Sequence, residues 1–280
     1  MSKRLSLKVA ITGGSGFLGK SLIKRFLTEG YTIHALSRKK RKSTKRLIWF
    51  QGEVCGKIPD KFFVKNKPFI HIAGSNKSNL HEINALGTKK IIIGATKAQV
   101  SNVVYISSCA VYDFSSNKKN IHVNSKKNIL NEYSKSKLYA EKIVRKLSRK
   151  SKIPYLILRP ASIISEKRHN KLLKLFDLLI KIRLLPLFIP KNCHFYITDL
   201  NSFSRTIFML HANKSNMVVN CCRTVNWEKY FGKDKDDHKR FICISEKLLD
   251  IVRSLASKHT FFMRHPFLFS VLSPSKIKSV

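Results

Sequence analysis

Residues 12–19 read TGGSGFLG, and this stretch decides the fold of the chain. It follows the short apolar segment LKVAIT (7–12), which has the length of a strand, and it precedes apolar residues that recur at helical spacing. Between a strand and a helix, Gly13, Gly16 and Gly19 would let the backbone turn tightly and would let a pyrophosphate approach the helix N-terminus. A glycine-rich turn that binds nothing is the alternative. The position of the turn between strand and helix favours dinucleotide binding.

Short apolar segments and helical patterns continue to alternate as far as residue 160. Further strands are predicted at 31–37, 46–50, 68–74, 103–107 and 155–159, and helices over 79–99 and from Tyr133 to about residue 149. Strands that alternate with helices in this way pair in parallel and are covered by helices on both faces. The predicted fold class is therefore α/β, a Rossmann-type doubly wound parallel sheet.

The chain divides into a regular part and a less regular part. Residues 1–160 are predicted to form an NAD(P)-binding Rossmann domain, and residues 194–221 are expected to return to it. The remaining segments of 161–280 are expected to form a smaller C-terminal substrate-binding cap. The apolar run 172–190 is interrupted by charged residues and by Pro186, so it is predicted to be a mostly buried helix and not a transmembrane span.

The composition is strongly basic. The chain has 55 Lys and Arg residues against 16 Asp and Glu residues, which gives a formal net charge of +39. Such a charge attracts phosphates, nucleic acid and anionic membrane surfaces, although biased base composition in the coding DNA would also scatter Lys along the chain. Nucleic acid or an anionic membrane surface is therefore a less favoured partner than a small-molecule substrate.

Cysteine usage and the N-terminus bear on the cellular compartment. The chain has six Cys residues but no C-x-x-C pair, and its N-terminus lacks the apolar core of a signal peptide. A reducing, cytoplasmic location is therefore expected, and no metal site is predicted.

The end of the second predicted strand bears on the choice between NAD and NADP. NAD sites usually have an acidic residue there to hold the ribose 2′-hydroxyl, whereas this chain has Ser37 and Arg38, followed by further cations. Cations suit a 2′-phosphate, so NADP is favoured, with NAD as the alternative. Ser37 and Arg38 are the expected contacts because they directly follow the strand. A solvated basic loop or a nucleic-acid contact would produce the same pattern.

Tyr133 and Lys137 stand four residues apart in a stretch that is predicted to be helical. Residues at this spacing lie on one helix face, so the Lys137 ammonium can lie beside whatever the Tyr133 hydroxyl contacts. A nearby positive charge favours phenolate and would lower the Tyr133 pKa toward working pH. By itself the pair is common in helices, and the rest of the chain must show whether it is catalytic.

An ordered set of motifs resembles the extended short-chain dehydrogenase/reductase superfamily, in its NAD-dependent epimerase/dehydratase branch. The motifs are TGGSGFLG (12–19), GE (52–53), HIAG (71–74), NALGT (84–88), SSCAVY (107–112), YSKSK (133–137), LRP (158–160) and HFYITDL (194–200). The last is similar to a strand that lies near the substrate in that family. Eight motifs in the family's order make the resemblance specific over about 190 residues.

The resemblance implies roles for individual residues. Tyr133 would be the general acid/base, Ser108 would hydrogen-bond the same substrate oxygen, and Lys137 would lower the Tyr133 pKa and hold the nicotinamide ribose. Ser107 would support the strand end through its backbone. For Asn84, the alternative to a role in the nicotinamide pocket is a hydrogen bond between helix and loop. The cofactor would contact Gly13, Gly16, Phe17, Leu18, Gly19, Ser37, Arg38, Glu53, Ala73, Gly74, Asn84, Tyr133, Lys137 and Pro160.

Departures from the family pattern narrow the expected chemistry. Family members that eliminate water follow the active-site hydroxyl with Asp-Glu, whereas Cys109 and Ala110 follow Ser108 here, so dehydration is disfavoured. Cys109 is expected to be a small buried side chain. The expected activity is that of an oxidoreductase or epimerase acting on a hydroxyl or keto carbon, with a nucleotide sugar as the favoured substrate.

Two other functions and one assembly state are also considered. A reductase of a non-sugar carbonyl is one alternative, and a weakly active cofactor-binding scaffold held on an anionic partner is the other. The resemblance further implies a homodimer formed through the helices around 79–99 and 130–149.

Overall fold

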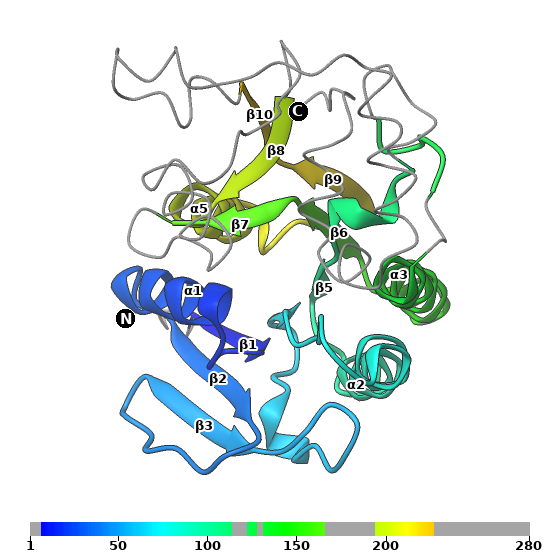
Figure 1. The fold of residues 1–280 in the computed structure, drawn as a ribbon. Coiled ribbons are helices and arrows are strands. Elements are labelled where there is room, and N and C mark those ends of the chain that lie inside the picture. Colours follow the sequence, from blue (N-terminus) through cyan, green and yellow to red (C-terminus); the bar gives the residue numbers. More distant parts are fainter. Residues whose placement is uncertain (1–6, 114–121, 128–130, 166–193, 227–280) are drawn as a thin grey trace, which may run out of the picture. The chain divides into compact units, whose positions relative to one another are not determined.

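The computed structural model describes residues 7–113, 122–127, 131–165 and 194–226 of the chain (Figure 1). It falls into two compact units. The first contains residues 1–111, 128–160 and 200–220, and the second contains residues 112–127, 161–199 and 221–280. The expected buried helix at 172–190 and the C-terminal half of the expected cap lie outside the described residues.

A seven-stranded sheet forms the centre of the first unit. Its strand order is β3-β2-β1-β4-β5-β6-β9, and β1 to β6 pair in parallel. The strands are β1 (Lys8–Thr12), β2 (Thr32–Ser37), β3 (Leu47–Gln51), β4 (Pro68–His71), β5 (Asn102–Ile106), β6 (Tyr155–Pro160) and β9 (Met217–Cys221). The order of the first six strands is that of a Rossmann fold, so the predicted fold class is confirmed.

Two pairs of helices flank this sheet (Figure 1). On one side, α1 (Phe17–Thr28) packs against α5 (Leu200–Leu210). On the other side, α2 (Gly87–Lys97) packs against α3 (Glu132–Lys150). A π-helical turn, Glu82–Leu86, leads directly into α2 and contacts α3. Because parallel strands need a crossover on one face or the other, the helical segments between them cover both faces.

The core explains why the central strands carry almost unbroken apolar runs. Residues of β1 such as Val9 and Ile11, and Val103 and Val104 in β5, have no exposed surface. A strand that is covered by helices on both faces has no solvent side, so its sequence does not alternate between apolar and polar residues. Burial on both faces therefore produces the short apolar segments on which the fold prediction depended.

The second unit contains a three-stranded sheet in the order β10-β8-β7. Its strands are β7 (Ser162–Ile164), β8 (His194–Asp199) and β10 (Arg223–Asn226). Strand β8 pairs in parallel with β7 and antiparallel with β10. The whole of 194–221 was expected to return to the Rossmann part, but the structure divides this segment. Its strand β8 belongs to the smaller sheet, while α5 and most of β9 belong to the first unit.

The element boundaries differ from the predicted ones at two places. Strand β4 ends at His71 and not at Gly74, because the N–H groups of Ile72 and Ala73 turn to the side-chain oxygen of Thr12. The helix predicted over 79–99 starts with helical residues at Leu80 and His81 and is then interrupted by the π-helical turn Glu82–Leu86.

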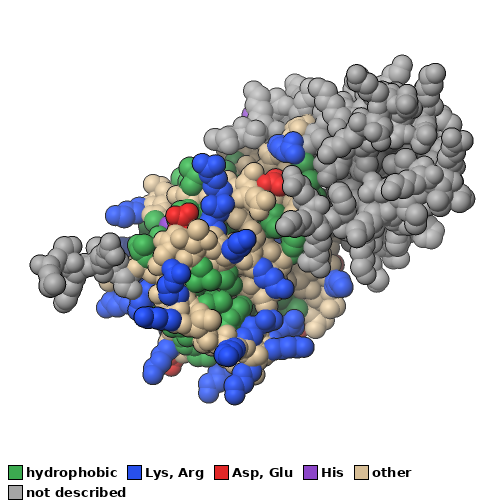
Figure 2. Space-filling view, turned by 90° about the vertical axis from the view of Figure 1, so that its left-hand side faces the viewer, with side chains coloured by type: hydrophobic (Ala, Val, Ile, Leu, Met, Phe, Trp, Pro, Cys, Tyr) green, Lys and Arg blue, Asp and Glu red, His purple; other side chains and the backbone are tan. Residues whose placement is uncertain are grey.

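The surface of the described residues is basic wherever Figure 2 shows it. Lys and Arg side chains are spread over this face, and few acidic side chains lie between them. None of the described helices combines the length and the apolar character that crossing a membrane requires.

Candidate active site

The glycine turn between β1 and α1 has the geometry of a phosphate cradle. Gly13 has a positive φ of 72°, and a Cβ there would lie 2.8 Å from the backbone nitrogen of Ala73. A Cβ on Gly19 would lie 2.7 Å from Cα of Gly14, so the helix could not approach the turn. Gly16 is the N-cap of α1 and provides no side chain, and the first turn of α1 has no acidic residue. A helix N-terminus with no capping side chain and no carboxylate favours a nearby anion, which fits a dinucleotide pyrophosphate.

A chain of buried side chains runs from the end of β1. The Thr12 hydroxyl oxygen accepts the Ala73 N–H at 3.3 Å and lies 2.7 Å from Nδ1 of His71. The Thr88 hydroxyl donates to the backbone oxygen of Asn84 at 2.6 Å, so its oxygen must accept from Nε2 of His71, 3.0 Å away. His71 is therefore the neutral tautomer with its proton on Nε2. Burial lowers the pKa of His71 to about 3, so the ring stays neutral in the working pH range.

The end of β2 brings together one predicted residue and one that was not predicted. The Ser37 side chain is buried, and its hydroxyl accepts a hydrogen bond from Nε of Arg41 at 3.0 Å. The Arg41 guanidinium also lies over the Trp49 ring, 5.1 Å from its centre. Arg38 is exposed, and its backbone oxygen accepts from the Gln51 side chain at 3.4 Å. Arg41 was not predicted as a cofactor contact, because only Ser37 and Arg38 directly follow the strand.

The other residues expected at the cofactor lie at the carboxyl ends of the strands or in α1. Gly74 follows β4 and is exposed, and a Cβ there would lie 2.9 Å from Oδ1 of Asn84 and 3.5 Å from Nζ of Lys137. Glu53 is exposed in a tight turn after β3, where its backbone oxygen accepts the Gly56 N–H at 3.1 Å. Leu18 and Pro160 are buried, Phe17 and Ala73 are half-buried, and Gly16 is exposed.

Asn84 ties the loop after β4 to α3. It is buried in the π-helical turn, accepts the Ser75 N–H at 2.8 Å and donates to the Ser75 backbone oxygen at 2.9 Å. Its amide also donates to the Ser136 hydroxyl at 3.0 Å, which in turn donates to the backbone oxygen of Tyr133 at 2.7 Å. The helix-to-loop hydrogen bond that was considered as the alternative is therefore present. It places Asn84 between the β4 loop and the first turn of α3.

The first turn of α3 is fixed by two side chains that the sequence analysis did not single out. Asn131 caps the helix by accepting the Ser134 N–H at 2.7 Å. The Ser134 hydroxyl donates to the backbone oxygen of Ala110 at 2.6 Å. The turn that follows Ser108 is thereby joined to the start of the helix that carries Tyr133.

Tyr133 and Ser108, far apart in the sequence, lie close enough for the Ser108 side chain to lower the pKa of the Tyr133 phenol. The Ser108 oxygen also accepts the Ala110 N–H at 3.1 Å, and both side chains are half-buried. Burial raises the pKa of the Tyr133 phenol, and the hydrogen bond to Ser108 offsets part of this rise. The net direction is opposite to the lowering that was expected from a neighbouring ammonium. In this state the phenol therefore holds its proton and can act as an acid.

Lys137 lies one turn further along α3, with only 6% of its surface exposed. Its ammonium donates to the backbone oxygen of Ile106 at 3.0 Å and lies 5.2 Å from the centre of the Tyr105 ring. Burial lowers the pKa of Lys137 to about 8, although the nearby Glu141 carboxylate raises it. A lysine beside Gly74 whose pKa lies near neutral pH is suited to hold a hydroxyl group and to take part in proton transfer.

Comparison with known proteins agrees with this geometry. The model of the NAD dependent epimerase/dehydratase family matches residues 9–185. The mouse sterol-4-alpha-carboxylate 3-dehydrogenase, decarboxylating, is 28% identical over 110 residues, which are 37% of this chain and 30% of that protein. An Escherichia coli O157:H7 protein, N-acetyl-alpha-D-glucosaminyl-diphospho-ditrans,octacis-undecaprenol 4-epimerase, is 23% identical over 175 residues, which are 60% of this chain and 52% of that protein. The chain thus spans about a third of the length of the first curated relatives that it matches.

A solved structure shows the same fold. The UDP-glucuronic acid 4-epimerase of Bacillus cereus, in complex with NAD, superimposes with a TM-score of 0.64 at 18% sequence identity. The superposition covers 85% of this chain and 88% of that chain.

Proposed function

The chain belongs to the NAD-dependent epimerase/dehydratase family, and we propose that it is an NAD(P)-dependent oxidoreductase or epimerase acting on a hydroxyl or keto carbon. The observation that carries this proposal is the arrangement of Ser108, Tyr133 and Lys137 at the carboxyl end of the sheet. In Rossmann folds this end is where dinucleotide and substrate meet.

The roles of the three side chains follow from their contacts. Bound at the glycine turn, the nicotinamide supplies hydride transfer to or from the substrate carbon. The Tyr133 phenol donates its proton to the carbonyl oxygen of the substrate, or takes the proton back when a hydroxyl is oxidised. Ser108, whose side chain acts on the Tyr133 phenol, orients the same oxygen. Lys137 holds the nicotinamide ribose and stabilises the phenolate that forms.

For the nucleotide, we propose a preference for NADP, with NAD as the alternative. Arg38 is free to reach a 2′-phosphate because its guanidinium is exposed. Arg41 adds a second cation at the same strand end, held by Ser37 and by the face of Trp49. Two guanidinium groups beside a strand end without a carboxylate favour an additional phosphate.

For the substrate, we propose a nucleotide sugar. The E. coli and B. cereus proteins are sugar epimerases by name, and the shared family supports a related substrate here. Reduction of a non-sugar carbonyl is the second candidate, and the match to the mouse sterol dehydrogenase favours it. Cys109 and Ala110 after Ser108 leave no Asp-Glu pair for water elimination, so dehydration is not proposed.

For assembly, we propose a homodimer through α2 and α3. Leu86 and Tyr139 are about half exposed on this helix pair, at 48% and 50%. The His81 ring packs on Tyr139 with 5.4 Å between ring centres, so side chains of the two elements meet at this surface. A cytoplasmic location also remains a prediction.

The proposal is tested first by fluorescence titration of the purified protein with NADPH and with NADH. We expect NADPH to bind more tightly than NADH. The variants Arg38→Ala and Arg41→Ala should each weaken NADPH binding by about tenfold or more, because each removes a charge-assisted contact to phosphate. NADH binding should change little. Lys61→Ala, at an exposed cation after β3, is the matched control.

Turnover is then screened with nucleotide sugars and with apolar ketones, using Tyr133→Phe as the variant without the proton donor. Nucleotide-sugar turnover that Tyr133→Phe abolishes would support the favoured substrate, and ketone reduction would support the second candidate. Binding of neither nucleotide would contradict the enzyme proposal. Salt-sensitive retention on an anionic surface would then favour the cofactor-binding scaffold.

A further inference from the structure

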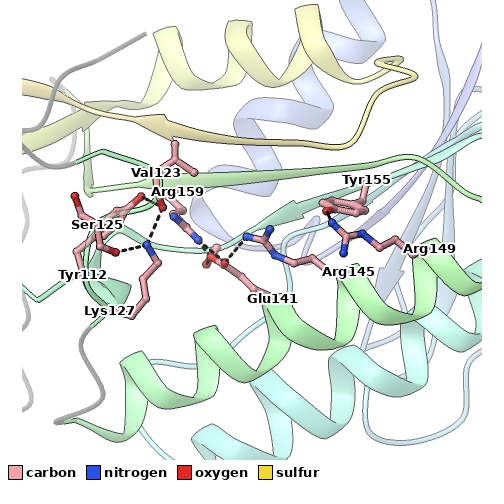
Figure 3. A network of polar contacts seen from close by, with 10 residues as sticks. Tyr112, Val123, Ser125, Lys127, Glu141, Arg145, Arg149, Tyr155 and Arg159 are labelled. Atoms are coloured by element: carbon pink, nitrogen blue, oxygen red, sulfur yellow. Dashed lines mark hydrogen bonds and ion pairs between the residues drawn. The ribbon is translucent and has the colours of Figure 1, made fainter.

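A buried ion pair lies behind the proposed active site, between α3 and the end of β6 (Figure 3). Glu141 has 3% and Arg159 has 1% of its surface exposed. Nε of Arg159 donates to Oε1 of Glu141 at 2.8 Å, and Nη2 donates to Oε2 at 2.6 Å. Arg145 adds a longer contact of 3.4 Å to Oε2. Glu141 is thus held by a two-point guanidinium contact, the geometry that fixes a carboxylate most firmly.

Both members of the pair also hold the short segment that carries Ser108. The Ser107 hydroxyl donates to Oε1 of Glu141 at 2.6 Å. The Cys109 thiol donates to the backbone oxygen of Arg159 at 3.0 Å. The residue before Ser108 and the residue after it are therefore each tied to one partner of the same ion pair. Ser107, expected to act through its backbone alone, acts through its side chain as well.

The charge of the carboxylate acts on the other side of the site. Burial alone would raise the pKa of Glu141, but the hydrogen bond and charge of Arg159, the hydrogen bond from Ser107 and the charge of Arg145 lower it below its usual value. The resulting carboxylate lies one helical turn beyond Lys137 and raises the pKa of that lysine against the effect of burial. The pair therefore holds the two neighbours of Ser108 and acts by charge on Lys137.

We propose that Glu141 and Arg159 are positioning residues that hold the segment carrying Ser108 beside Tyr133, through their hydrogen bonds with Ser107 and Cys109. This inference rests on the proposed function, because it assigns these residues to the same active site. A buried ion pair adds little net stability, since removing two charges from water offsets most of their attraction. Its rigid geometry suits it to fixing the segment between β5 and α3.

The first test is the variant Ser107→Ala, which cuts the link while leaving the ion pair intact. Ser148→Ala is the matched control, because Ser148 is also fully buried, lies on α3, and has a hydroxyl without a hydrogen-bond partner among the described residues. In crystal structures of both variants, we expect the Ser108 hydroxyl to move away from the Tyr133 hydroxyl in Ser107→Ala alone. An unchanged distance between these two hydroxyl groups in Ser107→Ala would overturn the proposal. This readout needs no substrate, so it is independent of whether the proposed activity is found.

With a substrate in hand, the kinetic readout separates positioning from general loss of structure. Ser107→Ala should lower kcat by roughly tenfold to a hundredfold, because a small displacement of a catalytic group has a large effect on rate. The KM for the nucleotide should stay within twofold of wild type. Equal kcat values in Ser107→Ala and Ser148→Ala would contradict the proposal.

A second variant, Glu141→Gln, tests the influence on Lys137. The pKa of Lys137 is read by NMR titration of protein labelled at lysine Cε, with the signal identified by its loss in Lys137→Arg. Removal of the carboxylate should move this pKa below about 8, because the positive charge loses its nearest anion. Glu132→Gln, in the exposed first turn of the same helix, should leave it unchanged. An unchanged Lys137 pKa in Glu141→Gln would remove that part of the inference.

Discussion

At the scale of single residues, the proposed site contains a buried charge, the ammonium of Lys137. Lys137 is an ammonium with almost no exposed surface and a hydrogen bond to the backbone oxygen of Ile106. Its pKa is lowered to about 8 because the charged form is less stable in the buried position than in water. Such a disadvantage is expected of a residue that serves the proposed chemistry and not stability.

Replacement of this lysine should therefore stabilise the protein while it removes activity. The folded-state pKa of Lys137 is lowered from 10.5 to about 8, so between these values the unfolded chain binds more protons and wild-type stability rises with pH. Below pH 8 the full penalty acts. At pH 7, Lys137→Met should gain up to roughly 3 kcal/mol in free energy of unfolding, measured by urea denaturation.

The pH dependence distinguishes this effect from better packing of methionine. The advantage of Lys137→Met over wild type should shrink as the pH rises above 8 toward 10.5. Lys135→Met changes an exposed lysine on the same helix and should give no such pH-dependent gain. A constant advantage at every pH would show that burial of the charge is not its source.

At the scale of elements, α3 is the part of the molecule that assembles the site. Its N-cap, Asn131, sets where the helix begins, and Ser134 joins the first turn to the backbone of Ala110. Tyr133 lies between these two fixed residues, so its position depends on the helix start. The start of α3 thus determines where the proposed proton donor, Tyr133, lies.

Loss of the helix cap at Asn131 should lower the stability of the protein. Asn131→Ala removes the acceptor of the Ser134 N–H, and we expect about 1 kcal/mol lower free energy of unfolding by urea denaturation. Asn131→Asp is the control, because Asp caps helices equally well and its charge suits the N-terminus. If Asn131→Ala were as stable as Asn131→Asp, the cap would contribute nothing to α3.

The sequence predicted most of the first unit because its signals are local. The glycine turn, the apolar strands and the i, i+4 pair Tyr133–Lys137 are each readable within a few residues. The Glu141–Arg159 pair was not predicted, since nothing local marks two charges 18 positions apart as partners. Strand β8 was assigned to the wrong sheet for a similar reason, because an apolar pattern predicts a strand but not the strand with which it pairs.

At the scale of the whole molecule, the excess of positive charge has to be reconciled with self-association. Lys142 and Lys146 are exposed on α3, the helix that the proposed dimer would use. Like charges that meet across an interface repel, and salt screens them. Exposed apolar side chains such as Leu86 and Tyr139 must therefore supply the attraction.

The dimer proposal predicts that salt strengthens association. Light scattering after size exclusion should give a mass of about twice the 32.2 kDa chain, with a larger dimer fraction at high salt than at low salt. Tyr139→Glu should yield monomer. Met209→Glu, at a 69% exposed residue of α5, is the control and should leave the dimer intact. A monomeric wild type at high salt would contradict the proposal.

The hydrogen-bond chain through Thr12, His71 and Thr88 has a consequence for how this protein can change. Every hydroxyl and ring proton in it has a single direction, so replacing one member leaves a buried donor or acceptor in its neighbour unmatched. An apolar residue at His71 would leave the Thr12 proton without its acceptor. Removing the Thr12 hydroxyl as well would not repair this, because the N–H groups of Ile72 and Ala73 donate to the same oxygen. The three side chains are therefore also tied to the backbone around them, and each is hard to replace singly or together.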